Sequence, residues 1–268
     1  DVFGQGDHAV RAFSGVWSLA LFPLVWFAGR RFANARVAWF AVALLALSPY
    51  GIRYGAETRM YAMVSVVVLV GWFVLDDALR KPAAWRLVVI ALLTSALLWT
   101  HYWAMWLLGT VGVMLLVRAW HARRDERADD LRATLLVVGA VIAGGLLFLP
   151  WLPSLLYQGT HTGTPWARPV RPTEMMTFTI ADLGGGADSE AVLVGWFVAI
   201  LIMIGILGKA VTRFRVELDV RTQPQGRQFA IVILGTMGLA CAVGYLTGAT
   251  YASRYAAVFY PFLILLAA

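Results

Sequence analysis

The stretch LVVIALLTSALLWTHYWAMWLLGTVGVMLLV, residues 87–117, contains no Asp, Glu, Lys or Arg. A helix crosses the hydrocarbon core of a membrane with about 20 apolar residues, within a range of roughly 17–25. Residues 87–117 can therefore form one long tilted helix or two shorter helices that turn at WTHYW, residues 99–103. The choice decides on which side of the membrane every later loop lies.

Apolar residues dominate the whole chain of 268 residues: 60% are hydrophobic, 14% are charged and the mean hydropathy is +0.73. These values are typical of a membrane protein. Because backbone groups in lipid must be satisfied within their own segment, helices are the expected spanning elements. The sequence thus predicts an all-α, polytopic transmembrane helical bundle. Besides residues 87–117, the predicted spans are residues 13–29, 37–52, 60–75, 131–149, 191–208, 229–246 and 256–268.

Basic residues decide between one helix and two in residues 87–117. Loops on the cytoplasmic side of a membrane hold an excess of Lys and Arg. With a helical hairpin at Thr100 and His101, the loops on one side hold 16 of the 22 basic residues, whereas a single helix destroys this asymmetry. The sequence therefore predicts the hairpin, and about nine spans in total.

The positive charge of the chain, formally +7 with a pI near 9.9, lies mostly in short loops beside apolar runs. Such basic loops set the orientation in the membrane, so nucleic acid is not an expected partner. The single cysteine, Cys241, lies inside an apolar run and is expected to pack there as a small residue.

The domain organisation is predicted to be one transmembrane domain over residues 1–268. It is expected to be cut at both ends, because the chain begins at Asp1 and stops inside an apolar run. Residues 150–190 form the longest loop on the side opposite the basic loops, which we call the outer face. Within that loop, WLPSLLYQ is expected to form a short helix in the membrane interface, with Trp151, Leu155 and Leu156 toward lipid.

The turn GIRYGAETRMYAM, residues 51–63, places Glu57 between Arg53 and Arg59 on the outer face. Charged groups at a membrane boundary are unfavourable without a partner and often mark functional sites. The plainer interpretation is that the arginines reach lipid phosphates, that Glu57 pairs with one of them, and that the tyrosines of the turn form an interfacial aromatic belt. The residues alone leave both interpretations open.

Three further stretches, taken with this turn, resemble a known family. AVRAFSGVWSLA, residues 9–20, precedes the turn, THY, residues 100–102, follows it, and ASRYAAVFYPFLILLAA, residues 252–268, ends the chain. In order and spacing they resemble the GT-C class of polytopic glycosyltransferases, in particular the bacterial branch related to protein O-mannosyltransferases and lipid A aminoarabinose transferases. The resemblance is firmest over residues 8–117 and is not recognisable between 150 and 230.

The resemblance implies transfer of a sugar from a polyprenyl-phosphate donor to an acceptor glycan, lipid or protein. The site would lie among membrane lipids at the outer face of the bacterial cytoplasmic membrane. The resemblance also implies that the catalytic base is an aspartate upstream of Asp1, since Asp7 matches a non-catalytic position. The fragment alone is then expected to be inactive.

Several residues of the outer face are candidates for the site that the resemblance implies. A carboxylate there would position the acceptor or bind a divalent metal ion, and cationic side chains would bind the donor phosphate. The catalytic candidates are Glu57, His101 and Asp182, and the substrate-binding candidates are Arg59, Tyr61, Tyr102, Arg254 and Tyr255.

The candidates also have structural alternatives. His101 and Tyr102 could cap the predicted helical hairpin. Arg254 could extend to lipid phosphates. Asp182 precedes three glycines and could serve a turn alone.

Two other classes of function are compatible with a polytopic helical chain. One is a transporter or flippase for lipids or small molecules, and the other is a membrane assembly factor without activity. Transporters place ionisable residues near the bilayer midplane, often with broken helices and internal repeats. Here the ionisable residues lie at the ends of predicted spans and no internal repeat is recognised, which favours the enzyme.

Overall fold

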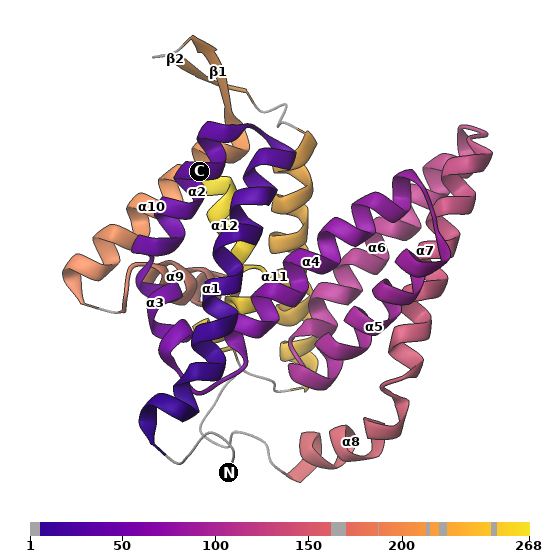
Figure 1. Ribbon diagram of the computed structural model, residues 1–268, viewed down its shortest axis with the longest axis horizontal. Helices are drawn as coiled ribbons and strands as arrows, with labels where there is room; N and C mark the ends of the chain where they lie inside the picture. Colours follow the sequence, from indigo (N-terminus) through magenta and orange to yellow (C-terminus); the bar gives the residue numbers. More distant parts are fainter. Residues whose placement is uncertain (1–5, 162–169, 187, 213–214, 220–223, 248–250) are drawn as a thin grey trace. The chain divides into compact units, whose positions relative to one another are not determined.

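The computed structural model describes residues 6–161, 170–186, 188–212, 215–219, 224–247 and 251–268. These residues form α-helices, two short 3-10 helices and one β-hairpin (Figure 1). The predicted all-α class is confirmed, and the hairpin is an addition that the sequence analysis did not predict. The elements are α1 (Asp7–Phe32), α2 (Ala35–Leu47), α3 (Pro49–Ala56), α4 (Tyr61–Arg80), α5 (Ala84–Thr100), α6 (Ala104–Arg124), α7 (Ala128–Leu146), η1 (Leu149–Trp151), α8 (Leu152–His161), α9 (Pro172–Leu183), α10 (Ser189–Leu207), β1 (Gly208–Thr212), β2 (Arg215–Leu218), α11 (Pro224–Thr247), η2 (Ser253–Val258) and α12 (Tyr260–Ala267).

Six helices of the described residues are long and apolar enough to cross a membrane, and seven if α2 and α3 form one broken span. The axes of α2 and α3 differ by 59° at Ser48. Helix α5, with 17 residues, lies at the lower limit for a span, and α12, with eight residues, is shorter than a span. The chain therefore has the helices of a multi-pass membrane protein, and the total of nine spans stays a prediction.

The chain forms two compact units. Unit 1 comprises Asp1–Val66, Arg171–Leu234 and Tyr251–Ala268. Its centre is α12, in which every residue from Tyr260 to Leu266 is buried. Helix α12 packs against α1, α2 and α10, and α10 packs against α9. The last predicted span thus forms the core of this unit.

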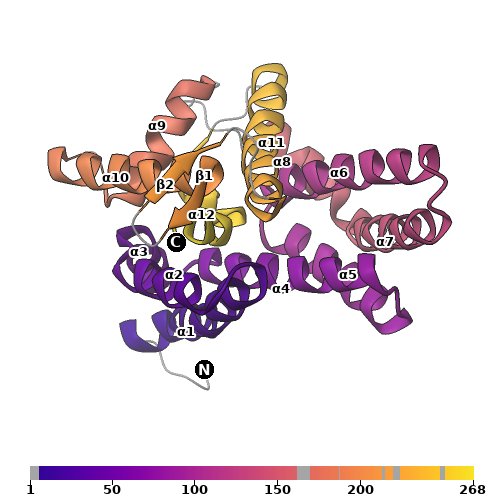
Figure 2. The ribbon, with the colours of Figure 1, turned by 90° about the horizontal axis from the view of Figure 1, so that it is seen from above.

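Unit 2 comprises Val67–Val170 and Gly235–Thr250, and α5, α6 and α7 pack together in it (Figure 2). The indole of Trp99, near the end of α5, donates a hydrogen bond to the Leu147 carbonyl at the end of α7. At the other end of α7, Asp130 forms an ion pair with Arg118 of α6. Helix α5 is therefore parallel to α7 and α6 is antiparallel to it. The predicted helical hairpin is confirmed, with its turn at residues 101–103.

Helix α8 follows a 3-10 turn at Leu149–Trp151, so the predicted helix after Pro150 is confirmed. Leu156 is exposed, and Trp151 and Leu155 are half-buried. The Trp151 indole donates a hydrogen bond to the Tyr102 hydroxyl at 2.8 Å, which ties the start of α8 to the turn between α5 and α6. The location of α8 in the membrane interface stays a prediction.

Helix α9 corrects the expectation of irregular structure around Asp182. Pro172 occupies the first turn of α9, and the Glu174 carboxylate accepts a hydrogen bond from the Arg171 amide at 3.0 Å. A proline at the first position and a carboxylate at the third both favour a helix start. Asp182 therefore lies in the last turn of helix α9, which ends at Leu183, and the glycines follow the helix.

Candidate functional site

Residues 57–60 form the turn between α3 and α4, and local contacts hold it. The sequence predicts the turn over residues 51–63, but residues 51–56 belong to helix α3 and residues 61–63 to α4. The Ser48 hydroxyl accepts a hydrogen bond from the Gly51 amide at 3.3 Å and caps the start of α3. Helix α3 ends where the Glu57 amide donates to the Arg53 carbonyl. The Ser14 hydroxyl of α1 donates to the Arg59 carbonyl at 2.9 Å and so fixes the turn against α1.

Asp182 of α9 contacts two residues of α3. Its carboxylate accepts a hydrogen bond from the Tyr54 hydroxyl at 2.8 Å and forms an ion pair with Arg53 at 3.3 Å. Asp182 is 6% exposed, whereas the Arg53 side chain is 56% exposed. A buried carboxylate is stable only when its oxygens are bonded, and both oxygens of Asp182 have a partner here. Asp182 therefore joins a segment that is 128 residues away in the chain.

Glu57 and Arg59 lie on the turn itself. Glu57 is half-buried, and its Oε2 atom is buried without a hydrogen-bond partner among the described residues. Arg59 is exposed and donates to the Tyr61 hydroxyl at 3.4 Å. This hydrogen bond, with the negative charge of Glu57 nearby, raises the pKa of Arg59 above its usual value. A buried polar atom without a partner is rare in folded proteins and often belongs to a ligand site.

Arg254 and Tyr255 of η2 lie close to α3. The Tyr50 hydroxyl of α3 donates to the Arg254 carbonyl at 2.9 Å. The Arg254 guanidinium lies over the Tyr255 ring, 5.5 Å from its centroid, and its Nε atom is buried without a hydrogen-bond partner among the described residues. The Thr179 and Tyr251 hydroxyls, 2.5 Å apart, join α9 to the residues just before η2.

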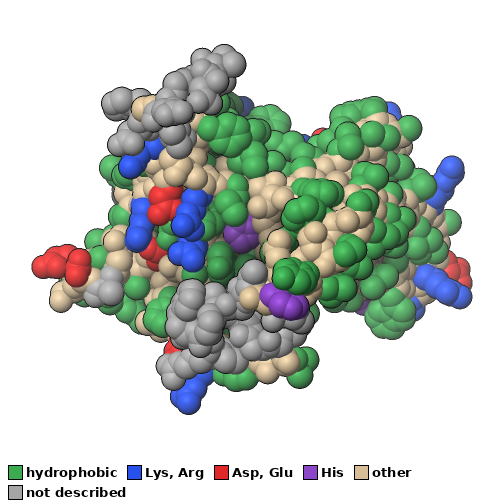
Figure 3. Space-filling model, turned by 90° about the horizontal axis from the view of Figure 1, so that it is seen from below, with side chains coloured by type: hydrophobic (Ala, Val, Ile, Leu, Met, Phe, Trp, Pro, Cys, Tyr) green, Lys and Arg blue, Asp and Glu red, His purple; other side chains and the backbone are tan. Residues whose placement is uncertain are grey.

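Helices α3 and α9, the turn and η2 thus bring most of the predicted site residues into one part of unit 1. Figure 3 shows basic and acidic side chains next to one another on the face seen from below. We call the residues that these contacts bring together the α3 cluster. It consists of Tyr50, Arg53, Tyr54, Glu57, Arg59, Tyr61, Asp182, Arg254 and Tyr255.

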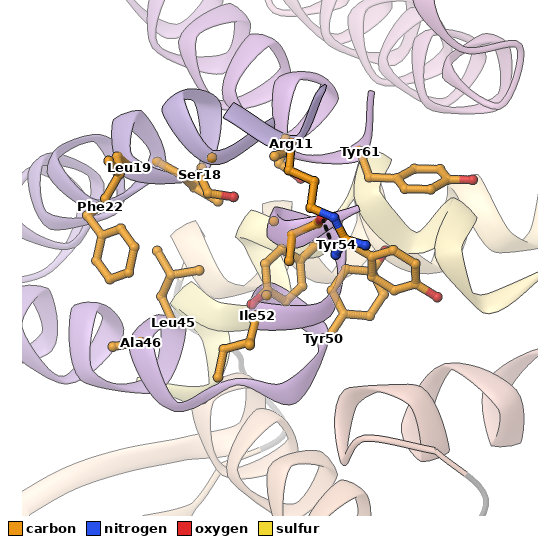
Figure 4. A pocket seen from close by; sticks show the side chains of 18 of the residues that line it. Arg11, Ser18, Leu19, Phe22, Leu45, Ala46, Tyr50, Ile52, Tyr54 and Tyr61 are labelled. Atoms are coloured by element: carbon orange, nitrogen blue, oxygen red, sulfur yellow. Dashed lines mark hydrogen bonds between the residues drawn. The ribbon is translucent and has the colours of Figure 1, made fainter. Parts of the chain in front are cut away.

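An apolar cavity of about 500 Å³ lies beside the α3 cluster, between α1, α2, α3, the start of α4 and α12. Figure 4 shows Leu19 and Phe22 of α1 on one side and Leu45 of α2 on the other. Arg11 also lines the cavity and donates a hydrogen bond to the Ala56 carbonyl at 3.5 Å. The volume falls within the roughly 300–1,000 Å³ typical of ligand pockets.

His101 and Tyr102 belong to unit 2, where they have structural contacts. His101 is buried, and its Nδ1 atom accepts a hydrogen bond from the Trp103 amide at 3.1 Å. The Tyr102 hydroxyl accepts from Trp151 and donates to Gln158 at 2.9 Å. These contacts fit the capping alternative for the helical hairpin. A catalytic or substrate-binding role for the two residues stays a prediction.

The sequence did not predict that Arg53 and Tyr54 contact Asp182, nor the cavity that Arg11 lines. The repeat of small and apolar residues along α1 at Gly15, Ser18 and Phe22 is a signal for one wall of the cavity. No group of three or more His, Cys, Asp or Glu that could hold a metal ion occurs in the described part of the chain. The predicted divalent ion at Glu57 is thereby left untested.

Comparisons of this chain with protein-family models, with curated proteins and with solved structures gave no match.

The variant Asp182→Ala is expected to lower the free energy of unfolding by about 1–3 kcal/mol, because the Tyr54 hydroxyl loses its acceptor in a buried place. The apparent unfolding temperature in detergent, followed by tryptophan fluorescence, measures the effect. Asp188→Ala is the matched control, since Asp188 is exposed and makes no side-chain cap to α10. Equal unfolding temperatures of the two variants would show that the Asp182 contacts do not stabilise unit 1.

Proposed function

We propose that the protein transfers a sugar from a polyprenyl-phosphate donor to an acceptor hydroxyl at the outer face of the cytoplasmic membrane. The observation that carries this proposal is the α3 cluster, which lies beside an apolar cavity. In this cluster, Glu57 lies near Arg59 and has a carboxylate oxygen without a partner among the described residues. A lipid-linked donor needs a charged site for its phosphate and an apolar site for its tail. The order and spacing of the sequence motifs support the same reaction.

The charges around the turn favour an anionic ligand. The charged residues of the α3 cluster, together with Arg11 at the cavity, are four arginines and two carboxylates. Positive charge is therefore in excess among them. These residues are Arg11, Arg53, Arg59, Arg254, Glu57 and Asp182. Asp182 already neutralises part of the charge of Arg53. The other guanidinium groups are then available to a donor phosphate, which arginine binds with paired hydrogen bonds.

In the proposed reaction, the bond between the anomeric carbon and the phosphate oxygen breaks while the acceptor oxygen bonds to that carbon. The proton of the acceptor hydroxyl passes to the aspartate that the resemblance implies as the catalytic base. Arg254 and Arg59 would stabilise the negative charge that develops on the departing polyprenyl phosphate. Glu57 would hold the acceptor hydroxyl through its buried Oε2 atom, which has no partner among the described residues. The apolar cavity beside Tyr50 would hold part of the donor tail.

The test is transfer of labelled sugar from a panel of polyprenyl-phosphate donors in membranes that contain the full-length protein. We expect transfer above the empty-vector background from at least one donor. We expect Arg254→Gln to raise the donor KM about 10-fold or more, because a charge-assisted hydrogen bond contributes about 1.5–3 kcal/mol. Arg36→Gln is the control, since Arg36 lies at the start of α2 and outside the α3 cluster.

A transporter or flippase remains the second candidate, because the break between α2 and α3 is a feature of many transporters. The two functions predict different results with the same membranes. Movement of a labelled lipid between leaflets, without transfer from any donor, would contradict the glycosyltransferase and support the transporter.

A further inference from the structure

The β1–β2 hairpin is attached directly to a candidate membrane span. Helix α10 has 19 residues and packs against α9 and α12, and it leaves one apolar face with Leu193, Trp196 and Phe197 exposed. Strand β1 begins at Gly208, immediately after the last residue of α10. At the other end of the hairpin, the Asp219 amide donates a hydrogen bond to the Leu207 carbonyl at 2.7 Å. The base of the hairpin is therefore held at the end of the span, at the boundary of the membrane.

The two strands give the hairpin a polar and an apolar face. In the antiparallel register, Lys209 pairs with Glu217, and Gly208 pairs with Leu218. Successive residues of a strand point to opposite faces. Glu217 therefore shares one face with Arg215, as their ion pair at 2.7 Å confirms, and Val216 shares the other face with Leu218.

The apolar face is not covered by the described part of the protein. Leu218 is 76% exposed and Val216 is 56% exposed. An isolated two-stranded hairpin is at best marginally stable in water and needs another surface to pack against. The position at the end of α10 makes the lipid headgroup layer the nearest such surface.

Charge indicates the kind of lipid. The segment of residues 209–227 contains five basic and two acidic residues. Three more arginines, at residues 30, 31 and 36, lie around the turn between α1 and α2, at the end of unit 1 from which the hairpin projects (Figure 1). Basic segments beside a span are attracted to anionic headgroups.

We infer that the β1–β2 hairpin is a contact site for anionic lipids. Val216 and Leu218 lie among the outer carbons of the acyl chains, and Lys209 and Arg215 bind lipid phosphates. The long stems of Lys and Arg allow the charged groups to reach the headgroups from the polar face. The inference concerns the surface of unit 1 opposite the α3 cluster and does not depend on the proposed reaction.

The test uses the full chain with Cys241→Ala and one new cysteine, Leu218→Cys, labelled with an environment-sensitive fluorophore. The protein is reconstituted in vesicles of phosphatidylcholine, alone or mixed with phosphatidylglycerol, that contain spin-labelled lipid as a quencher. The matched control is Glu217→Cys, one residue away on the opposite face. We expect about twofold stronger quenching at residue 218 than at 217, and stronger quenching when phosphatidylglycerol is present.

A second pair of variants tests the charges in the same vesicles. The double variant Lys209→Gln and Arg215→Gln is expected to lose the effect of phosphatidylglycerol at residue 218. The double variant Lys209→Arg and Arg215→Lys is expected to keep it, because the charges are retained. Equal quenching at residues 217 and 218, or no effect of phosphatidylglycerol, would overturn the inference. Energy transfer between labelled copies at residue 218 would identify a second chain as the partner and would overturn it as well.

Discussion

Replacement of Glu57 by Gln in the full-length protein should abolish sugar transfer and leave membrane insertion intact. Gln keeps the size of the side chain but removes the charge that holds the acceptor hydroxyl. Loss of one positioned hydrogen-bonding group in an active site lowers turnover by about 10²–10³-fold, so turnover is expected to fall at least about 100-fold. Transfer of labelled sugar per amount of inserted protein measures the effect.

The matched control for this variant is Glu190→Gln. Glu190 is an exposed residue in the first turn of α10, on the same predicted outer face. We expect it to retain the turnover of the parent protein. Equal turnover of the Glu57 and Glu190 variants would exclude Glu57 from the site, whereas a loss in both would indicate a general sensitivity to charge.

The variant Gly144→Val should prevent stable packing of unit 2. A Cβ atom at Gly144 would clash with the Ala91 carbonyl and lie 2.6 Å from the Thr94 Cβ, both in α5. A backbone carbonyl within a helix cannot turn away as a side chain can, so α5 and α7 would have to separate. Overpacking of a core usually costs about 1–3 kcal/mol and occasionally more, and we expect at least about 3 kcal/mol here. The yield of monodisperse protein and its unfolding temperature measure the loss.

The neighbouring residue supplies a close control for this substitution. Gly145 is also in α7, but a Cβ atom there would meet nothing within 4 Å. Gly145→Val introduces the same β-branched side chain into the same helix and should change the unfolding temperature much less. Similar losses in both variants would mean that the helix propensity of valine, and not the contact with α5, explains the effect.

The sequence predicts those features that depend on neighbouring residues or on the preference of Lys and Arg for one side of the membrane. The reversal between α5 and α6 follows from the distribution of Lys and Arg, because only a hairpin keeps most of the basic residues on one side. The turn between α3 and α4 follows from the polar residues between two apolar runs, whereas the glycines of this stretch, Gly51 and Gly55, lie in helix α3. The helix after Pro150 follows from the apolar pattern of WLPSLLYQ.

The remaining features depend on contacts between distant segments, which a single sequence does not reveal. Asp182 binds Tyr54 across 128 residues, and Tyr50 binds the Arg254 carbonyl across 204. Helix α9 has local start signals in Pro172 and Glu174, but it is too short to be recognised as a membrane span. The β-hairpin follows α10 at Gly208, where the apolar pattern of the span ends and no turn motif marks two strands.

The break between α2 and α3 has a consequence for motion. Pro49 has no amide hydrogen, so the Leu45 carbonyl loses its usual helical donor and instead accepts a hydrogen bond from the Ser48 amide at 3.4 Å. The Ser48 hydroxyl in turn accepts from Gly51. The Leu45 carbonyl and the Gly51 amide therefore both keep a hydrogen bond at the bend. Beyond the bend, Tyr50 is bonded to the Arg254 carbonyl and Tyr54 to the Asp182 carboxylate. Any movement of α3 about this bend, as in a gate, would have to break both hydrogen bonds.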